Sequence, residues 1–428
     1  MSQIAQEVLA ALRSLGGVEQ MREMAESGYG PPERLKTNLH IHLPPNFSAF
    51  ESVEQAVTLA AEQGVGVLCA GNYYDYDVFE EFAARARRRG IFPMFGTEII
   101  ALVDELVRDG VRINDPGNPG RMYVCGKGIT RFGHPTKEAA RLLGIIRRND
   151  AKRMAEMVGK LAEVFEQRGL ATGLDEEAIK DMVVRRCGCP REVVVLQERH
   201  LARAFQEALF AIVTPDRRID CLSRILETDF TSKADDGRKI QNDIRSCLMK
   251  AGKVAFVAET FVSLPQAYRL ILELGGIPCY PTLADGASPI CRYEQPVEKL
   301  IDNLKAARIH CAEFIPARNT PKVLSRYVKA TRRAGLPVVA GTEHNTPDLL
   351  EMSPTCAGRQ PVPDDIKDIF WEGACVAAAH QFLTASGRCG FVNDDGRVND
   401  AYDNDDERIE AFAALGAAVI RRYYEVNG

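Results

Sequence analysis

Two histidines that could share a metal ion lie near the start of the chain. His40 and His42 are two residues apart in LKTNLHIHL (residues 35–43), where polar and apolar residues alternate as they do in a β-strand. Side chains two apart on a strand point to the same face, so both imidazoles can converge on one point. Neutral imidazole binds zinc and other transition metals. The pair therefore indicates a metal site, and the alternative is one buried, hydrogen-bonded histidine beside an incidental neighbour.

Other polar side chains follow further predicted strands. They are Asn72 and Tyr73 after VGVLCAG, Glu98 in FGTEI, Tyr280 and Thr282 after GGIPC, and Glu343 and His344 in GTEHNTP. In a parallel βα barrel the carboxyl ends of the strands form one face, and that face carries the active site. We therefore expect these residues to meet at one mouth.

The elements that would position them alternate between strand and helix. Strands are predicted at residues 35–43, 65–70, 91–100, 277–280, 309–315 and 337–340, with helical patterns between them. Repeated βα units predict a parallel sheet, open or closed into a barrel. From about residue 136 to 253 the pattern is mostly helical with charged faces, which indicates an insertion. The tail is expected to hold two more helices, at 365–383 and 407–424.

Composition excludes several classes of protein. The 428 residues are 46% hydrophobic and 26% charged, as in an ordinary globular protein. A net charge of −5 gives no reason to expect a nucleic-acid duplex as partner. No apolar run approaches the roughly 20 residues that span a bilayer. The start lacks a secretory pattern, and twelve cysteines then favour reduced thiols, so we expect a cytoplasmic protein.

The chain resembles the PHP (polymerase and histidinol phosphatase) family over roughly residues 35–135 and 253–350. The motifs that carry the resemblance are NLHIHL, FPMFGTEI, LGGIPCYP, IHCAEFIPARNTP and GLPVVAGTEHNTP. LQERHLARAFQEAL is similar to a helix inserted in a subgroup that acts on nucleotide phosphates. The resemblance implies a distorted (β/α)7 barrel that binds up to three metals and hydrolyses phosphoesters. The expected segments are a helical extension (1–34), the first barrel part (35–135), a helical insertion (136–252), the second barrel part (253–350) and a helical tail (351–428).

By this resemblance a first metal would be held by four side chains: His40, His42, Glu98 and Glu343. The other family sites have lost ligands, because Asn72-Tyr73 replace Asp-His, Tyr280 replaces a His, and Asn345 stands where the closing His belongs. Tyrosine is a poor replacement, since its phenol stays protonated up to a pKa near 10. We predict one firmly bound divalent ion (zinc, manganese or iron), with the other sites absent or rebuilt.

Further residues are predicted to act on the substrate. The candidates for an acid, an orienting donor or a rebuilt ligand are Tyr73, Tyr280, His134 and His344. Arg318, Lys127 and Arg131 follow or end predicted strands and could bind a phosphate, although ordinary surface ion pairs are the alternative. His200, in the inserted helix, is a substrate-binding candidate by resemblance, with a partly exposed helical histidine as the alternative.

The resulting hypothesis is a metal-dependent phosphoesterase. It would hydrolyse a small phosphorylated metabolite or nucleotide through a metal-activated water. Two alternatives stay open: a barrel that has lost catalysis and serves binding or regulation, and a lyase or isomerase acting on a sugar acid. The sequence leaves the substrate and the oligomeric state open.

Overall fold

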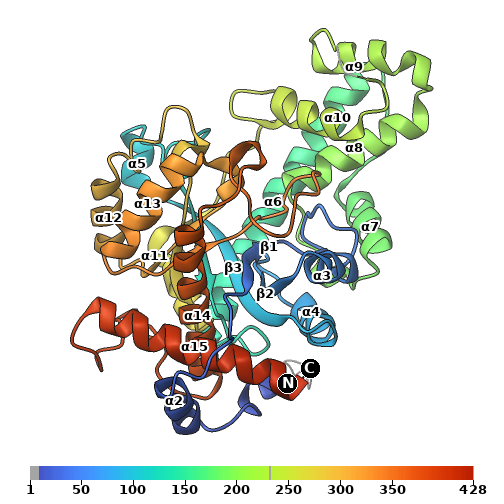
Figure 1. The fold of residues 1–428 in the computed structure, drawn as a ribbon. Helices are drawn as coiled ribbons and strands as arrows, with labels where there is room; N and C mark the ends of the chain where they lie inside the picture. Colours follow the sequence, from blue (N-terminus) through green and yellow to red (C-terminus); the bar gives the residue numbers. More distant parts are fainter. Residues whose placement is uncertain (1–8, 231–232, 428) are drawn as a thin grey trace.

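The computed structural model describes residues 9–230 and 233–427, and at its centre lies a nearly closed, barrel-shaped sheet (Figure 1). Seven strands form its path: β1 (Lys36–Ile41), β2 (Val65–Ala70), β3 (Phe92–Leu102), β4 (Arg121–Lys127), β6 (Ile277–Thr282), β7 (Cys311–Phe314) and β8 (Val338–Ala340). The short β5 (Val262–Ser263) pairs with β3 off this path. The ends meet where the amides of Thr342 and Glu343 donate to the His40 carbonyl at 3.1 and 2.8 Å. This confirms the predicted α/β barrel.

One strand runs opposite to the expected direction. β4 is antiparallel to both β3 and β6, with Lys127 opposite Gly96 and Cys125 opposite Cys279. Residues 103–120, which join β3 to β4, contain only the five-residue helix α5 (Asp104–Arg108), about 7.5 Å long. Such a helix is too short to return the chain along the eleven-residue β3. The residues after β4 therefore lie at the end of the barrel opposite the mouth.

Helices cover the outside of the barrel and hold the strand ends in place. They are α3 (Val53–Glu62), α4 (Val78–Arg88), α11 (Leu264–Glu273), α12 (Val297–Ala306) and α13 (Pro321–Arg333). Ser52 caps α3, because its hydroxyl accepts from the Gln55 amide at 3.1 Å. Ser263 and Gln266 form a capping box at the start of α11. Each of these helices buries apolar residues in one hydrophobic cluster shared with the strands.

A single long helix joins the barrel to a helical arm. The first half of α6 (Lys137–Gln167) buries Leu142 and Ile146 in the barrel cluster, and its second half buries Leu161 and Phe165 in a separate cluster. Around that second cluster pack α7 (Glu176–Cys187), α8 (Glu198–Ile212), α9 (Arg218–Leu226), α10 (Gly237–Ile244) and a π-helical turn η3 (Arg245–Met249). We call residues 150–257 the arm, which projects from the barrel in Figure 1.

The tail forms the two expected helices, α14 (Asp364–Ala385) and α15 (Asp405–Asn427). The side-chain amide of Gln381 on α14 bonds the Phe95 amide at 2.9 Å and the Pro93 carbonyl at 3.2 Å, which ties α14 to β3. Of the predicted extension, residues 1–8 lie outside the described residues, and α2 (Val18–Glu26) packs on α15.

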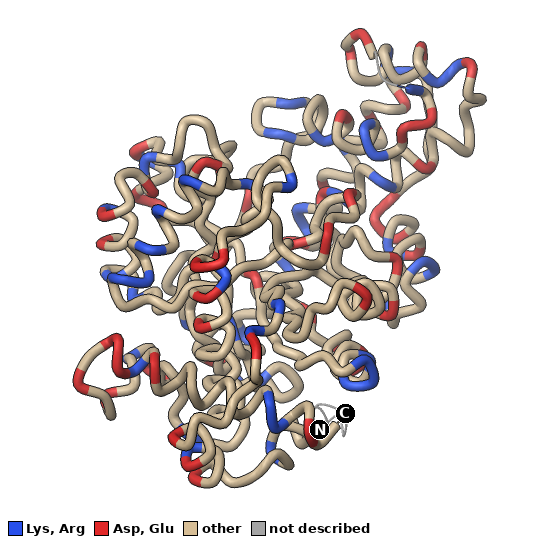
Figure 2. Tube along the Cα trace, in the orientation of Figure 1, with Lys and Arg blue, Asp and Glu red and all other residues tan. Residues whose placement is uncertain are grey.

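Acidic and basic residues are interspersed over both the barrel and the arm, as Figure 2 shows. Within residues 9–230 and 233–427, no helix combines the length and apolar character that crossing a membrane requires.

Candidate metal centre

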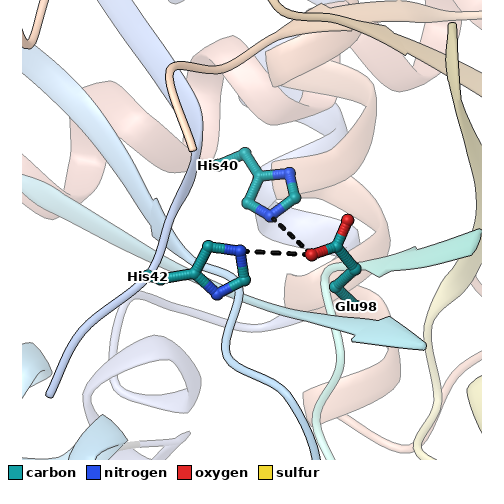
Figure 3. Close-up of side chains that lie close together, drawn as sticks. All are labelled: His40, His42 and Glu98. Atoms are coloured by element: carbon teal, nitrogen blue, oxygen red, sulfur yellow. Dashed lines mark ion pairs between the residues drawn. The ribbon is translucent and has the colours of Figure 1, made fainter. Parts of the chain in front are cut away.

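Three of the predicted ligands, His40, His42 and Glu98, lie close together between the end of β1 and the middle of β3. The Nε2 atom of His42 lies 3.2 Å from Glu98 Oε2, and the Nε2 atom of His40 lies 4.0 Å from the same oxygen (Figure 3). None of the three side chains is more than 2% exposed. His40 lies on β1 and His42 follows its last residue, and their spacing of two brings both rings to Glu98.

The donor atoms of this cluster lack protein partners. His40 Nε2, both ring nitrogens of His42 and Glu98 Oε2 are buried without a hydrogen bond of acceptable geometry. An unsatisfied buried polar group costs about 1–3 kcal/mol, so these four atoms, three of which converge at Glu98 Oε2, require an explanation. Two imidazole nitrogens and a carboxylate oxygen form a donor set that suits zinc, manganese or iron. The residues present therefore fit a divalent metal ion.

Protonation at His42 and Glu98 also favours a cation. Burial lowers the pKa of His42, which keeps its imidazole neutral. Burial by itself would raise the pKa of Glu98, but the neighbouring His42 and His40 outweigh it and leave that pKa below its ordinary value. A neutral imidazole and an ionised carboxylate are the forms that ligate metals. Burial would lower the pKa of His40, but the charge of Glu313 outweighs it and raises that pKa, so a metal ion would displace a proton from His40.

Beneath His40 lies a second layer of buried polar residues. His40 Nδ1 is 2.9 Å from Glu313 Oε2, and Lys127 Nζ donates to Glu313 Oε1 at 2.7 Å and to the Leu39 carbonyl at 2.9 Å. Burial would raise the pKa of Glu313, but Lys127 and His40 outweigh it and bring the value to about 2. Lys127 was predicted to bind substrate; its side chain is buried inside the barrel on Glu313 and the Leu39 carbonyl, and the predicted role stays a prediction.

A second group with metal-ligand atoms overlaps this layer. His40, Cys125 and Glu313 offer atoms within 4.8 Å of one another. The ammonium of Lys127 already neutralises Glu313 there, and burial holds the pKa of the Cys125 thiol well above its ordinary value. This inner group is therefore a weaker candidate for a metal than the cluster of His40, His42 and Glu98.

Glu343, the predicted fourth ligand, lies at the mouth but has other partners. Arg318 donates to both of its carboxylate oxygens, at 2.9 Å from Nη1 to Oε1, and Asn345 donates to Oε2 at 2.9 Å. Its role as a ligand stays a prediction, since Arg318 would have to release at least one oxygen. The Arg318 side chain keeps 42% of its surface exposed and faces the cavity described below.

Tyr73 belongs to the centre, as predicted. Its ring stacks on His42 with centroids 4.8 Å apart and planes 9° from parallel, and its backbone bridges to Glu98. Burial, followed by the charge of Glu98, raises the pKa of Tyr73 well above its ordinary value, so its phenol keeps its proton. Asn72 beside it bonds the amide and carbonyl of Leu43 at 2.8 and 2.9 Å, which fixes the loop after β1.

Tyr280 and His344, two of the predicted catalytic residues, point away from the cluster. The Tyr280 hydroxyl donates to Glu294 Oε1 at 2.8 Å. His344 uses both ring nitrogens, at 2.8 Å from the Thr342 hydroxyl and 3.0 Å from the Leu350 carbonyl. Both side chains therefore hold loops at the mouth, and the structure gives neither a contact with His40, His42 or Glu98.

His134 and Arg131 lie at the far end of the barrel, because both follow the reversed strand β4. The Arg131 amide donates to the Leu274 carbonyl at 3.0 Å, next to the start of β6, and its guanidinium pairs with Asp394 at 2.6 Å. His134 is exposed beside it. Neither residue lies beside His40, His42 and Glu98, and their predicted roles at the site stay predictions.

His200 fastens the arm to the barrel. Its Nδ1 accepts from the Gln197 amide at 3.1 Å in a capping box at the start of α8. Its ring packs edge-to-face with Phe47, with the ring centroids 5.4 Å apart. Gln197 Oε1 in turn accepts from the Phe47 amide at 2.6 Å. Burial lowers the pKa of His200 to about 3, so its ring is neutral and packs at this junction, and its predicted role in substrate binding stays a prediction.

A cavity of about 520 Å³ opens onto Glu98 between the barrel mouth and the arm. Four cations in its wall are Arg199, Arg245, Lys250 and Arg318, and a cavity of about 290 Å³ that shares three of them adds Arg121 and Arg153. We call these six residues the cationic wall. Sequence reasoning named only Arg318, because basic residues in a helical pattern look like an ordinary solvated face.

Comparison with solved structures relates this architecture to barrel proteins. An amidohydrolase from Chromobacterium violaceum with bound sulfate and no metal is 18% identical, with 78% of this chain and 96% of that chain covered and a TM-score of 0.49. A protein described as a metal-dependent phosphoesterase from Bifidobacterium adolescentis is 14% identical, with 80% and 98% covered and a TM-score of 0.52. The likeness to the Bifidobacterium protein supports the assignment of the barrel fold. No family model and no curated protein matches the sequence.

Proposed function

We propose that this chain is a metal-dependent hydrolase of the PHP type that cleaves a phosphoester in a small anionic metabolite or nucleotide. The observation that carries the proposal is the position of Glu98. It belongs to the ligand cluster and also lines the cavity that holds four cations of the cationic wall: Arg199, Arg245, Lys250 and Arg318. The description of the Bifidobacterium protein as a metal-dependent phosphoesterase agrees with this proposal. The PHP-like motifs around His40, Glu98 and Glu343 lie at the same mouth.

The cationic wall has the charge and donors to bind a phosphate. Arg245 keeps a buried Nε that donates no hydrogen bond. Burial, and then the nearby charge of Arg245, lowers the pKa of Arg199 to about 10. Two guanidinium groups that repel each other in a cavity are stabilised by an anion between them. Substrate phosphate is thus expected among Arg199, Arg245 and Arg318, next to the centre.

The remaining chemistry divides between the ion and the chain. A divalent ion at this centre supplies Lewis acidity, which activates water and polarises a substrate oxygen. His40, His42 and Glu98 would hold it. Tyr73, stacked on His42 and protonated, is placed to donate a hydrogen bond to the reacting group. Arg318 can move between Glu343 and a substrate oxygen, because its side chain is partly exposed.

The test combines metal analysis with a screen for phosphate release. Protein purified without chelator is expected to hold about one zinc, manganese or iron per chain, and Glu98→Gln to lose it. Arg318→Met is expected to raise KM for the phosphoester that is hydrolysed by about 10-fold or more, since hydrogen bonds to charged groups contribute about 1.5–3 kcal/mol. Arg131→Met removes an arginine at the far end and serves as the control.

Substoichiometric metal, or no phosphate release from any ester with manganese or zinc added, would contradict the proposal. If the protein binds metal but releases no phosphate from any ester, the result would favour the alternatives that the sequence left open, a binding or regulatory protein or a lyase or isomerase.

A further inference from the structure

A buried chain of polar contacts leads from the floor of the barrel to the metal centre. Lys127 Nζ lies 2.7 Å from Glu313 Oε1, and Glu313 Oε2 lies 2.9 Å from His40 Nδ1. None of the three side chains is more than 2% exposed. The other ring nitrogen of His40, Nε2, faces Glu98 without a hydrogen bond. The chain of contacts therefore ends at a free ligand atom.

The donors along this chain can be assigned from the chemistry of each group. A lysine ammonium has donors and no acceptor, so Glu313 Oε1 must accept from Lys127. Lys127 also donates to the carbonyl of Leu39 at 2.9 Å. Because Leu39 directly precedes His40 in the sequence, this bond holds the Lys127 ammonium close to His40. The carboxylate has no proton to offer, so its Oε2 can only accept from His40. The single proton of a neutral His40 is then on Nδ1, and Nε2 carries the lone pair that a metal needs.

We infer that Lys127 and Glu313 are positioning residues that fix the tautomer of His40 and thereby set the metal affinity of the centre. The inference rests on the proposed metal centre and adds two residues that touch neither metal nor substrate. Outer residues that orient a ligand typically change metal affinity by about 10–100-fold when they are replaced.

Glu313→Gln gives a sharp test, because it keeps the shape and changes one atom. Lys127 can only donate, so it selects the carbonyl oxygen of the introduced amide and turns the amide NH2 toward His40. An NH2 group there requires Nδ1 to accept, which moves the imidazole proton to Nε2, the ligand position. Metal affinity is expected to fall about 10–100-fold.

The double variant Lys127→Met with Glu313→Gln separates this mechanism from simple damage. Without the ammonium, the introduced amide is free to flip and present its oxygen to His40, which restores the original tautomer. The double variant should therefore bind metal more tightly than Glu313→Gln alone. A role in packing predicts the reverse, because two buried substitutions would disturb the barrel more than one.

Two measurements on the full chain decide the matter. The first is histidine tautomers by 15N NMR of metal-free protein labelled at its seven histidines, with the His40 signal identified by its loss in His40→Asn. The second is zinc affinity by chelator competition, with Glu273→Gln, a buried glutamate at the opposite end, as the control. Expected are Nδ1–H in the wild type, Nε2–H in Glu313→Gln, and recovery in the double variant.

The inference is overturned if wild-type His40, read at a pH where its imidazole is neutral, carries its proton on Nε2. It is also overturned if Glu313→Gln binds zinc as the wild type does, or if the double variant binds no better than Glu313→Gln. The tautomer is read without metal, so a chain that binds no zinc would defeat the proposed function and leave this result separately measurable.

Discussion

At the scale of single residues, the centre depends on how closely the backbone after β8 approaches His40. A Cβ added at Gly341 would overlap the His40 Cβ and lie 3.0 Å from the His40 nitrogen and 3.1 Å from Glu313 Oε1. Gly341 thus packs closely against both His40 and its hydrogen-bond partner Glu313. A side chain at position 341 would push the imidazole away from Glu98.

Gly341→Ala is therefore expected to lose metal and stability together. We expect a decrease of about 1–3 kcal/mol in the free energy of unfolding, as overpacking of a core costs, and metal content well below that of the wild type. Urea unfolding of the metal-free protein and metal analysis measure the two effects.

Gly159→Ala is the matched control, because Gly159 lies in α6 with nothing within 4 Å of an added Cβ. It should stabilise the protein by about 1 kcal/mol and leave the metal content unchanged. Equal stability losses in both variants would refute the argument from packing against His40.

The ligand residues could be predicted from sequence, but their neighbours could not. The shared face of His40 and His42 follows from period-two alternation, which is a local property, whereas Glu98 was assigned as a ligand by the resemblance to the PHP family. The position of Lys127 inside the barrel could not be predicted, because the direction of β4 depends on how residues 103–120 fold, and no periodicity encodes that. Arg199 and Arg245 were missed because only the packing of the arm on the barrel turns these helix positions toward a cavity.

At the scale of elements, Glu198 holds three parts of the arm together. At the start of α8 it pairs with Arg153 of α6 at 2.8 Å, Arg245 of η3 at 3.3 Å and Lys250 at 2.9 Å, with 12% of its side chain exposed. Burial would raise the pKa of Glu198, but Lys250, Arg153 and Arg245 outweigh it and hold that pKa well below its ordinary value. The carboxylate therefore stabilises the folded arm while it is ionised.

This geometry predicts a pH-dependent contribution to stability. A lowered pKa in the folded state contributes stability that is fully present above the unfolded value of about 4.3 and is lost as the pH falls below it. At pH 7 Glu198→Gln should lower the free energy of unfolding by about 2–4 kcal/mol, because three cations lose their counter-charge.

Chemical denaturation from pH 7 to pH 3, followed by helical circular dichroism, tests this prediction. The difference between wild type and Glu198→Gln should shrink below about pH 4.3. A difference that stays constant down to pH 3 would show that the three ion pairs contribute nothing beyond packing.

Whether a segment forms a helix or a strand was easier to predict from the sequence than the direction in which a strand runs in the sheet. Two barrel helices, α3 and α11, follow the capping residues Ser52 and Ser263, and both tail helices lie close to their predicted ranges. Caps and apolar periodicity are short-range signals. The pairing direction of β4 and the π-helical turn η3 arise from tertiary packing instead.

At the scale of the whole molecule, two hydrophobic clusters are joined by α6, and the cavity lies between them. The barrel supplies Glu98 and Arg318 to its wall, whereas the arm supplies Arg199 and Arg245. A metal ion contacts only the barrel side in the proposed centre. A phosphate bound beside it would contact both sides.

Hydrogen exchange should distinguish the region that binds the metal ion from the region that binds phosphate. Zinc or manganese alone is expected to slow exchange of amides in β1 and β3, and adding millimolar inorganic phosphate is expected to slow it also at the start of α8 and in η3. Mass spectrometry of peptides from both regions measures this. Phosphate protection confined to the barrel would contradict a role for the arm in anion binding.

The length of α6 has a consequence for how sequences of this architecture can vary. Each residue of a helix advances 1.5 Å and turns 100°, so losing one residue where α6 leaves the barrel, near Asn149, would swing the whole arm by 100° about the helix axis. Arg199 and Arg245 would then face solvent instead of Glu98. Only insertions or deletions of about a whole number of helical turns would keep the arm facing the barrel mouth. The length of α6 between the two clusters can therefore change only in such steps, although α6 does not contact the reacting atoms.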